Sequence, residues 1–396
     1  MQGMDYIERD LKAKLSLALK TFPIVMISGP RQSGKSTFIR HELTDFLHLD
    51  LERPSDNRQV TYDLELFFKE HPGRVCIDEA QRCPELFPVL RHVSDSGQGN
   101  GRFVILGSAS PSLFHTAAET LTGRMGILAL TPFTARELFG TRQWKERWMW
   151  GGLPPIHAFP SDEQKLAWIE SYVLSVLEKD LPLLGVRVPS VRLMKFWTML
   201  THLQGGMLNV SSLAESMELS TNAVSHYLDI LEGALMIKRL PPFFANLGKR
   251  LVKRPKVYIR DTGILHWLAG IHRPEDLETW AGKGASFEGL AVGELMARAE
   301  LECSAPRFSF YRTQAGAEVD LLVETGGKIL PVEVKHAAGV GGHDMAGLRQ
   351  CMKDLGLEKG FVVTRGDSVR RLGEGIVSLP WEGIVAGEVT PWGRGG

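Results

Sequence analysis

The stretch Gly29-Pro-Arg-Gln-Ser-Gly-Lys-Ser-Thr37 decides the fold of the N-terminal part of the chain. It matches the pattern G-x-x-x-x-G-K-[ST], in which loop amides surround phosphate oxygens, the lysine reaches the terminal phosphates and the hydroxyl binds Mg²⁺. The apolar run 22–27 before it predicts a strand, and the residues from Phe38 onward predict a helix. The motif in this context indicates a nucleotide phosphate site.

Size and composition limit the classes of protein to consider. A chain of 396 residues suggests two or three domains, and its 46 basic and 46 acidic residues give a net charge of zero. Because there is no global positive field, any DNA site must come from local patches. Cys76, Cys83, Cys303 and Cys351 form no C-x-x-C pair, which argues against zinc and disulfides and favours the cytoplasm. The charged N-terminus does not look like a signal peptide, and no apolar run approaches the roughly twenty residues of a membrane span.

Residues 1–145 predict an α/β domain with a parallel sheet. Apolar segments alternate with helical stretches, which is typical of strands joined by crossover helices. The predicted strands are 22–28, 46–51, 74–78, 102–106 and 126–130.

Two acidic residues, Asp78 and Glu79, follow the third predicted strand, at the edge of the sheet where ligands bind. We expect Asp78 to hold Mg²⁺ and Glu79 to polarise the attacking water, since phosphoryl transfer needs positioning and charge neutralisation. An apolar strand that ends in Asp-Glu is also a common surface feature, and the phosphate loop favours the functional interpretation.

Two further residues have a functional and a structural interpretation. Ser108 ends the strand after Phe103 and would contact the γ-phosphate or the water, or would simply close a turn. Arg124 precedes the last predicted strand and would stabilise transition-state charge, or would be a solvated surface arginine.

Several segments in this order resemble the AAA-type ATPases of bacteria and archaea that carry a further C-terminal domain of poorly assigned function. They are the loop 29–36, Ile77-Asp-Glu-Ala-Gln81, Gly107-Ser-Ala-Ser110, Gly123-Arg124 and Leu130-Thr-Pro-Phe-Thr-Ala-Arg-Glu-Leu138. The resemblance implies ATP and Mg²⁺ as cofactors and ATP-promoted homo-oligomers, with hexameric rings as one form. The residues assigned to the nucleotide and its ion are Gly29, Pro30, Arg31, Gln32, Ser33, Gly34, Lys35, Ser36, Thr37, Asp78 and Ser108.

Residues 146–275 predict a mostly helical domain with a helix-turn-helix. After a helical stretch at 163–177, a short helix from Ser211, a turn at 218–219 and a second helix capped by Ser220 or Thr221 follow one another. The segment 255–260 would be a wing strand, and this region of the resembling family also looks like a winged helix.

A DNA-binding winged helix would place the start of its second helix in a groove. The residues predicted there are Thr221, Asn222, Ser225 and His226, and the cations predicted to reach phosphates are Lys249, Arg250, Lys253, Arg254 and Lys256. The alternative is that the winged helix only connects domains and that the basic run is solvated.

Residues 276–396 contain a predicted hairpin around Gly326-Gly327. Counting outward, Thr325 faces Lys328, Asp320 faces Glu333 and Glu318 faces Lys335. Because side chains alternate between faces, the acids and the lysine share one face. The other face would be apolar, with Val319, Leu321, Val323, Leu330, Val332 and Val334.

Opposed carboxylates repel, and a divalent cation between Asp320 and Glu333 would remove that cost. Lys335 beside them would position or deprotonate a water, as in metal-assisted phosphodiester cleavage. The alternative is a surface salt bridge between Lys335 and Glu318 with Asp320 solvated, which would contribute little.

The predicted order of the last domain is helix 285–299, strands 307–313, 317–324 and 328–335, helix 344–355 and strand 360–364. With D…E-x-K it resembles the restriction-endonuclease-like superfamily and its PD-(D/E)xK motif. The resemblance maps Asp320, Glu333 and Lys335 onto the catalytic acids and lysine, and Glu288 onto a helical acid. Asp320, Glu333 and Glu288 are then the predicted metal ligands, and Val319 stands where the motif has proline.

The fold expected is α/β: an AAA-type P-loop domain (1–145), a helical winged-helix domain (146–275) and an α/β restriction-endonuclease-like domain (276–396). The sequence predicts an ATPase that processes DNA, by remodelling or branch migration, with Glu79 and Arg124 as catalytic residues and Asp320, Glu333 and Lys335 in a nuclease module. The alternative is a nucleotide-switched signalling or interaction ATPase whose nuclease-like domain only binds. The retained Asp320, Glu333 and Lys335 favour the DNA-processing ATPase. The zero net charge of the chain favours the interaction ATPase.

Overall fold

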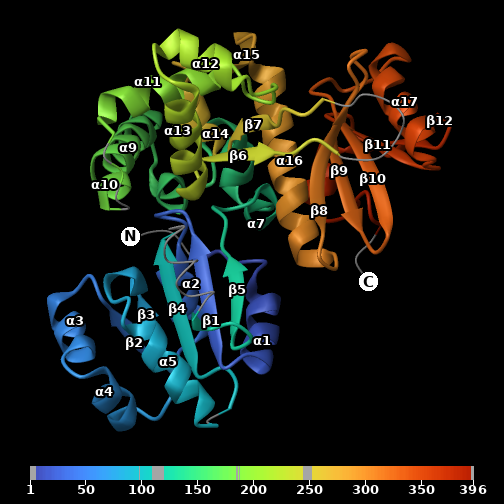
Figure 1. Ribbon diagram of the computed structural model, residues 1–396. Helices are drawn as coiled ribbons and strands as arrows, with labels where there is room; N and C mark the ends of the chain where they lie inside the picture. Colours follow the sequence, from blue (N-terminus) through green and yellow to red (C-terminus); the bar gives the residue numbers. More distant parts are fainter. Residues whose placement is uncertain are drawn as a thin grey trace. The chain divides into compact units, whose positions relative to one another are not determined.

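A computed structural model describes residues 6–97, 99–108, 120–183, 186, 188–243 and 252–393 and divides the chain into two compact units (Figure 1). Met1–Phe133, Leu153–Pro155 and Gly233–Leu235 form the first unit, and the remainder forms the second. Ala109, Ser110, Lys249 and Arg250, which the sequence analysis singled out, lie outside the described residues. In the described ranges, no helix has both the length and the apolar character needed to cross a membrane.

The first unit contains the parallel sheet that the sequence predicts. Its strand order is β2-β3-β4-β1-β5, and every pair is parallel. The strands are β1 (Ile24–Gly29), β2 (Leu47–Asp50), β3 (Val75–Asp78), β4 (Phe103–Ser108) and β5 (Met125–Ala129). All five predicted strands are therefore present.

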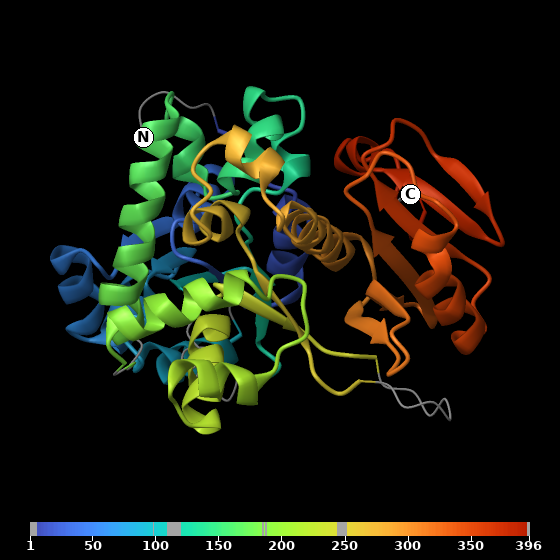
Figure 2. The ribbon, with the colours of Figure 1, turned by 90° about the horizontal axis from the view of Figure 1, so that it is seen from above.

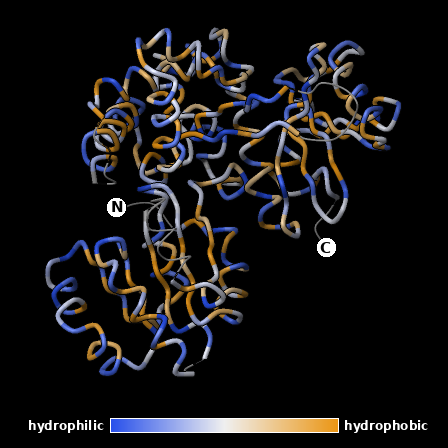
Figure 3. The backbone as a smooth tube through the Cα atoms, in the orientation of Figure 1, coloured by the Kyte–Doolittle hydropathy of each residue, from blue (hydrophilic) through white to orange (hydrophobic). Residues whose placement is uncertain are grey.

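The central strands consist mainly of hydrophobic residues (Figure 3). Ile24, Met26 and Ile105 lie in one apolar cluster with helix side chains such as Phe87, and the intervening Val25 and Ile27 are also fully buried. Such continuous burial requires cover on both sides of a parallel sheet. The helices of this unit are α1 (Lys12–Thr21), α2 (Lys35–Glu42), α3 (Pro54–Thr61), α4 (Leu64–Glu70) and α5 (Leu86–Asp95).

The second unit begins with a helical part. Its helices are α7 (Ala135–Leu138), α8 (Arg147–Trp150), α9 (Asp162–Ser175), α10 (Leu181–Leu183), α11 (Ser190–Thr201), α12 (Val210–Met217), α13 (Thr221–Gly233), α14 (Thr262–Leu268) and α15 (Pro274–Thr279). A π-helical segment, Val176–Asp180, continues α9. The antiparallel pair β6 (Ile237–Leu240) and β7 (Lys256–Ile259) follows α13.

The helix–turn–helix pair forms where the sequence predicts it. Glu218 takes a left-handed conformation (φ 54°) at the end of α12, and the Ser220 hydroxyl accepts the N–H of Ala223 at 3.1 Å. This short-range polar cap fixes the start of α13. Assignment of the pair and its ribbon as a winged helix stays a prediction.

The second unit also carries a mixed sheet of order β12-β13-β11-β10-β9-β8. Its elements are α16 (Lys283–Glu302), β8 (Arg307–Arg312), β9 (Glu318–Thr325), β10 (Lys328–Val334), α17 (Ala346–Leu355), β11 (Gly360–Thr364), β12 (Arg370–Gly373), β13 (Ile376–Pro380) and α18 (Trp381–Val385). The six predicted elements are present, and β12, β13 and α18 extend them.

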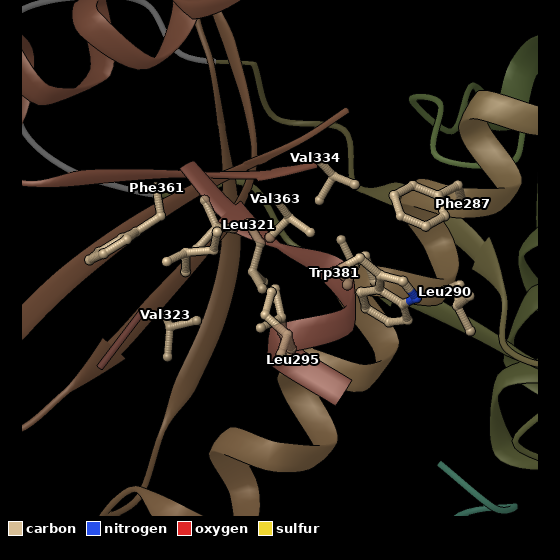
Figure 4. Close-up of a cluster of buried hydrophobic side chains, with 14 of the residues drawn as sticks. Phe287, Leu290, Leu295, Leu321, Val323, Val334, Phe361, Val363 and Trp381 are labelled. Atoms are coloured by element: carbon tan, nitrogen blue, oxygen red, sulfur yellow. The ribbon is translucent and has the colours of Figure 1, made fainter. Parts of the chain in front are cut away.

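Helices cover both faces of this mixed sheet. Phe287, Leu290 and Leu295 of α16 pack on one face against strand residues such as Leu321, and Trp381 of α18 joins them (Figure 4). A second cluster on the other face joins strand residues to α17, and seen from above α16 runs alongside the sheet (Figure 2). The acidic residues of β9 and β10 therefore do not lie on an open face.

The hairpin turn has the predicted register. The alternation of β9 side chains between the two faces of the sheet is interrupted before the first residue of the strand. Gly326 and Gly327 take positive φ (55° and 75°), and Thr325 pairs with Lys328. The β9–β10 pairing is registered as far as Leu321–Val332. Against β8, Ser309 pairs with Leu322 and Tyr311 with Val319, so β9 holds one extra residue, a β-bulge.

The bulge overturns the single apolar face predicted for β9. Leu321 and Val323 belong to the α16 cluster, whereas Val319 belongs to the α17 cluster with Leu322. One inserted residue shifts every preceding side chain to the opposite face. Asp320 therefore lies at an irregular point of the strand, and the simple facing of Asp320 and Glu333 is corrected.

Candidate nucleotide site and carboxylate cluster

The phosphate loop has a defined conformation in the first unit. Gly34 adopts φ 87°, which leads the chain into α2 at Lys35. Lys35 is buried, and its Nζ donates to the carbonyl oxygens of Gly29 (3.1 Å) and Pro30 (3.0 Å). Burial lowers the pKa of Lys35, and nearby Glu79 and Asp78 oppose that effect. The loop therefore holds the lysine where the oxygens of the terminal phosphates would accept its hydrogen bonds.

Ser36 and Asp78, both predicted Mg²⁺ ligands, are in contact. The Ser36 hydroxyl at the start of α2 donates to Oδ2 of Asp78 at the end of β3, and the other oxygen, Oδ1, accepts the N–H of Glu79 at 2.9 Å. Hydroxyl and carboxylate oxygens are the ligands that Mg²⁺ prefers. The residues present therefore fit a Mg²⁺ ion carried by a nucleotide.

Glu79 has an unusual backbone for its residue type. It adopts φ 55° and ψ 41°, a left-handed conformation that is uncommon outside glycine, and its carboxylate accepts a hydrogen bond from the Gln81 side chain. Burial raises the pKa of Glu79, and the neighbouring charge of Asp78 adds to the effect. Strained residues of this kind cluster at functional sites.

Ser108 lies between the phosphate loop and the acids. Strand β4 runs between β3 and β1, and its last residue, Ser108, pairs with Gly29. The structure thus brings the ends of β1, β3 and β4 to the same edge of the sheet. Of the loop residues, Gln32 and Thr37 are exposed, whereas Gly29, Pro30, Ser33 and Lys35 are buried; Arg31, Gly34 and Ser36 are half-buried.

Arg124 lies at the N-terminal ends of the parallel strands, and the phosphate loop lies at their C-terminal ends. It precedes β5, whose first residue pairs with Ile24 at the start of β1, and its backbone oxygen accepts the N–H of Ile24. The five steps of β1 from Ile24 to Gly29 separate it from the loop by roughly 16 Å, at about 3.3 Å per step. Its guanidinium binds Asp95 at 2.5 and 3.1 Å. Arg124 is therefore not part of the phosphate site of its own subunit.

Arg9 is a site residue that the sequence analysis missed. Its guanidinium donates to the carbonyl of Ser33 at 3.0 Å and to the carbonyl of Thr131, and it stacks 4.8 Å from the ring centroid of Phe133. Arg9 is buried and joins the phosphate loop to the segment after β5. No periodicity or motif around Arg9 signals this long-range role.

The residues predicted to touch DNA are mostly exposed. Thr221, Asn222 and His226 are exposed at the start of α13, and Ser225 is half-buried. Lys253 and Arg254 are also exposed before β7.

Lys256, two residues further on, is 1% exposed and points inward. The expectation that Lys256 reaches phosphate is therefore wrong.

Lys256 lies within a group that we call the carboxylate cluster, formed by Glu288, Glu318, Asp320 and Glu333. Its Nζ is 3.0 Å from Glu288, 2.6 Å from Glu318 and 2.8 Å from Asp320. Arg312 also binds Glu318, so the predicted pairing of Glu318 with Lys335 does not form. A long-range lysine thus neutralises the acids of α16 and β9.

Asp320 and Glu333 differ in their partners. Oδ2 of Asp320 accepts the N–H of Val334 at 2.9 Å, whereas Glu333 pairs with Lys335 at 2.8 Å. Burial, followed by the charge of Asp320, raises the pKa of Glu333 to about 8, and burial is also the main cause that raises the pKa of Glu288 to about 7. The two acids are therefore near each other but do not share one cation.

A metal ion does not fit the carboxylate cluster as it stands. Across the ranges that the structure describes, no group of three or more His, Cys, Asp or Glu side chains is arranged to hold one. The ammonium of Lys256 takes the position between the acids of Glu288 and Asp320. The predicted metal site of Asp320, Glu333 and Glu288 is thus not formed in this conformation.

Family comparisons divide the chain into three matched regions. Residues 21–139 match a family described as "AAA domain". Residues 141–275 match "Domain of unknown function (DUF8612)", and residues 283–384 match "Domain of unknown function (DUF4143)".

Two mycobacterial proteins are similar to nearly the whole chain. They are the uncharacterized proteins Mb2031c of Mycobacterium bovis and Rv2008c of Mycobacterium tuberculosis. Each is 38% identical over 379 residues, which cover 95% of this chain and 84% of the relative.

Solved structures give weaker similarities. The Walker-type ATPase PABY2304 of Pyrococcus abyssi has a TM-score of 0.49 at 16% identity, over 67% of this chain and 96% of that chain. A variant of RuvB of Thermotoga maritima has a TM-score of 0.28 at 20% identity, over 59% of this chain and 89% of that chain. Neither similarity bears on function.

Proposed function

Since the chain belongs to the family of these two mycobacterial proteins and carries an AAA-type P-loop ATPase domain, we propose that it hydrolyses ATP to process DNA. In this proposal the first unit supplies nucleotide chemistry and the second supplies DNA contacts and a nuclease-like module. The contact between Ser36 and Asp78 is the observation that carries the hydrolysis part.

The phosphate site assigns a role to each of its residues. Lys35 would neutralise the terminal phosphates, and Ser36 with Asp78 would hold the Mg²⁺ of the nucleotide, which supplies charge neutralisation when bound. Glu79 would orient a water and accept its hydrogen bond, and its raised pKa favours a carboxylate able to take up a proton. Arg9 would keep the loop in position through Ser33.

Contact with DNA rests on the exposed start of α13. Thr221, Asn222 and His226 present polar side chains at the helix end that enters a groove in helix-turn-helix proteins. Lys253 and Arg254 add exposed positive charge beside the β6–β7 ribbon. These local cations suit phosphate binding despite the zero net charge of the chain.

We also propose that ATP promotes homo-oligomers. Because Arg124 lies away from the phosphate site of its own subunit, a catalytic role for it requires a neighbouring copy. An arginine supplied in trans stabilises transition-state charge strongly in related phosphoryl transfers.

A second candidate function is a nucleotide-switched interaction ATPase with a nuclease-like domain that only binds. The burial of Lys256 among Glu288, Glu318 and Asp320 favours it, because the acids are already neutralised without metal.

The test is ATP turnover without DNA and with single-stranded, duplex and branched DNA. We expect at least one DNA form to stimulate turnover, and Lys253→Ala with Arg254→Ala to reduce binding and its salt dependence. Lys328→Ala with Arg371→Ala removes two other exposed cations and serves as the charge-matched control. Turnover that is indifferent to every DNA form would favour the interaction ATPase.

A further inference from the structure

Lys256 is a buried lysine whose ammonium group is surrounded by three carboxylates. Its Nζ lies 3.0 Å from Glu288, 2.6 Å from Glu318 and 2.8 Å from Asp320, and the residue is 1% exposed. Glu288 and Asp320 accept hydrogen bonds from the ammonium, which has donors and no acceptor, and Glu318 forms an ion pair with it. The position of Nζ is thus a cation position built from one helix and one strand.

The β6–β7 ribbon delivers this cation. The backbone of Lys256 pairs with Leu240 in β6 and bridges to Met207, so the start of β7 is held from two directions. Two residues along the same strand, the Tyr258 hydroxyl donates to Glu288 at 2.7 Å. The ribbon therefore contributes both a charge and a hydrogen bond to the acids of the mixed sheet.

Within the part of the chain that the structure describes, one oxygen atom of the carboxylate cluster remains without a hydrogen-bond partner when Lys256 is in place. The four acids of the cluster meet three cations, since Arg312 binds Glu318 and Lys335 binds Glu333. The second oxygen of Glu333, Oε2, is buried and has no hydrogen-bond partner among the described residues. A buried carboxylate oxygen without a partner is costly, so a further cation beside the four acids would find an unused ligand atom there.

A divalent ion and the ammonium cannot share this position. Mg²⁺ needs oxygens at about 2.0–2.1 Å, closer than the 2.6–3.0 Å at which the acids hold Nζ. Binding of a divalent ion by Glu288, Glu318 and Asp320 therefore requires the lysine side chain to leave.

We propose that Lys256 is a tethered cation that competes with a divalent metal ion for Glu288, Glu318 and Asp320. The carboxylate cluster then loads metal only after the lysine withdraws, which makes the β6–β7 ribbon an inhibitory element of the C-terminal module. This inference rests on the proposed function in one respect, the assignment of these acids to a nuclease-like module.

The direct test is Mn²⁺ binding to the nucleotide-free full-length chain, by calorimetry and by the electron paramagnetic resonance signal of free Mn²⁺. Lys256→Met should bind one Mn²⁺ at least about tenfold more tightly than wild type, because the competitor is removed. Adding Asp320→Asn to Lys256→Met should abolish that gain. Lys165→Met is the matched control, since Lys165 is also buried and binds Glu146 at 2.6 Å and Asp162 at 3.4 Å.

Each outcome decides a separate statement. Equal Mn²⁺ affinity in wild type and Lys256→Met overturns the competition and leaves a metal site in place. An absence of Mn²⁺ binding in both overturns the metal site and the competition together. The DNA dependence of ATP turnover is measured apart from these experiments, so its failure is distinguishable from either result.

A second measurement needs no substitution in the carboxylate cluster. Amine labelling of wild type followed by mass spectrometry should show Lys256 protected without metal and labelled several-fold faster at saturating Mn²⁺. Labelling of Lys165 should not change with Mn²⁺. Protection of Lys256 that is identical with and without Mn²⁺ overturns the proposal, even where Lys256→Met does not fold.

Discussion

The Nζ atom of Lys256 lies 2.8 Å from Oδ1 of Asp320, although 64 positions separate the two residues in the chain. The pair joins the β6–β7 ribbon to the mixed sheet. It also reverses the sign of a charge argument, because an acid expected to suffer repulsion is instead held by a buried ammonium.

We therefore expect Asp320→Asn to destabilise the metal-free protein, by about 1–3 kcal/mol, because it weakens the hold on a buried charge and on the Val334 N–H. All nine tryptophans lie beyond residue 133, so tryptophan fluorescence in denaturant reports the second unit alone. Glu324→Gln, in the same strand but in a longer ion pair with Arg307, is the control and should change stability by less than about 0.5 kcal/mol. Stabilisation by Asp320→Asn would contradict the lysine pairing.

The free energy of unfolding should depend on pH in a way that reflects the protonation of Glu333. Its pKa rises from 4.5 to about 8 on folding, so the folded protein keeps a proton that the unfolded chain has released. Stability conferred by this proton is fully present below about pH 4.5 and is lost as the pH rises to about 8.

Glu333→Gln should therefore lose less stability than wild type between about pH 5 and pH 8, by more than about 1 kcal/mol, as measured by denaturation across that range. Glu324→Gln should keep the wild-type slope. A slope in Glu333→Gln equal to that of wild type would show that this carboxyl is already ionised when folded.

At the nucleotide site, Lys35→Ala should abolish ATP hydrolysis by removing the charge that holds the terminal phosphates. Glu79→Gln should bind ATP yet hydrolyse it about 10²-fold or more slowly, since binding does not need the water-orienting carboxylate. Turnover and binding of a fluorescent nucleotide separate the two effects. Glu52→Gln, an exposed acid near Glu79, is the control, and wild-type turnover in Glu79→Gln would exclude the role given to Glu79.

The left-handed backbone at Glu79 predicts a conflict between stability and activity. Glu79→Gly should be more stable than Glu79→Ala by about 1 kcal/mol, because glycine tolerates φ 55° without steric cost. Both variants should lose hydrolysis. Thermal melts of the two proteins make the comparison, and equal stability would mean that the backbone relaxes away from this conformation.

Arg124 should act, if at all, on the site of a neighbouring subunit. Mixing inactive Lys35→Ala with inactive Arg124→Ala protein should restore part of the turnover, since one interface then holds both wild-type groups. Arg74→Ala, which breaks a comparable surface pair with Asp45, should stay active. Co-assembly without restored turnover would remove the trans assignment.

The features that follow from local pattern were predictable from sequence. The phosphate loop, the five parallel strands and the Gly326-Gly327 turn all follow from short motifs and alternation of apolar residues. The bulge at Asp320 was not, because alternation carries no sign of an inserted residue.

The sequence also did not predict contacts between side chains that are distant in the chain. Lys253 and Arg254 are exposed as expected, yet Lys256 in the same basic run is buried among acids from α16 and β9. Arg9 binds the phosphate loop from a segment without a motif. The contacts of both residues depend on which distant segments come together in the fold, and composition and local pattern do not predict that.

The ribbon also forms backbone hydrogen bonds with β8, which has a consequence for how the two regions of unknown function evolve. Pro241 accepts the N–H of Phe310 at 3.0 Å, and Val252 donates to Arg312 at 3.1 Å, so the ribbon also occupies the outer edge of β8. A chain recombined at residue 280 would expose that edge as a template for aggregation and would leave Glu288, Glu318 and Asp320 without their lysine. The two regions of unknown function are therefore expected to be exchanged between proteins as one cassette.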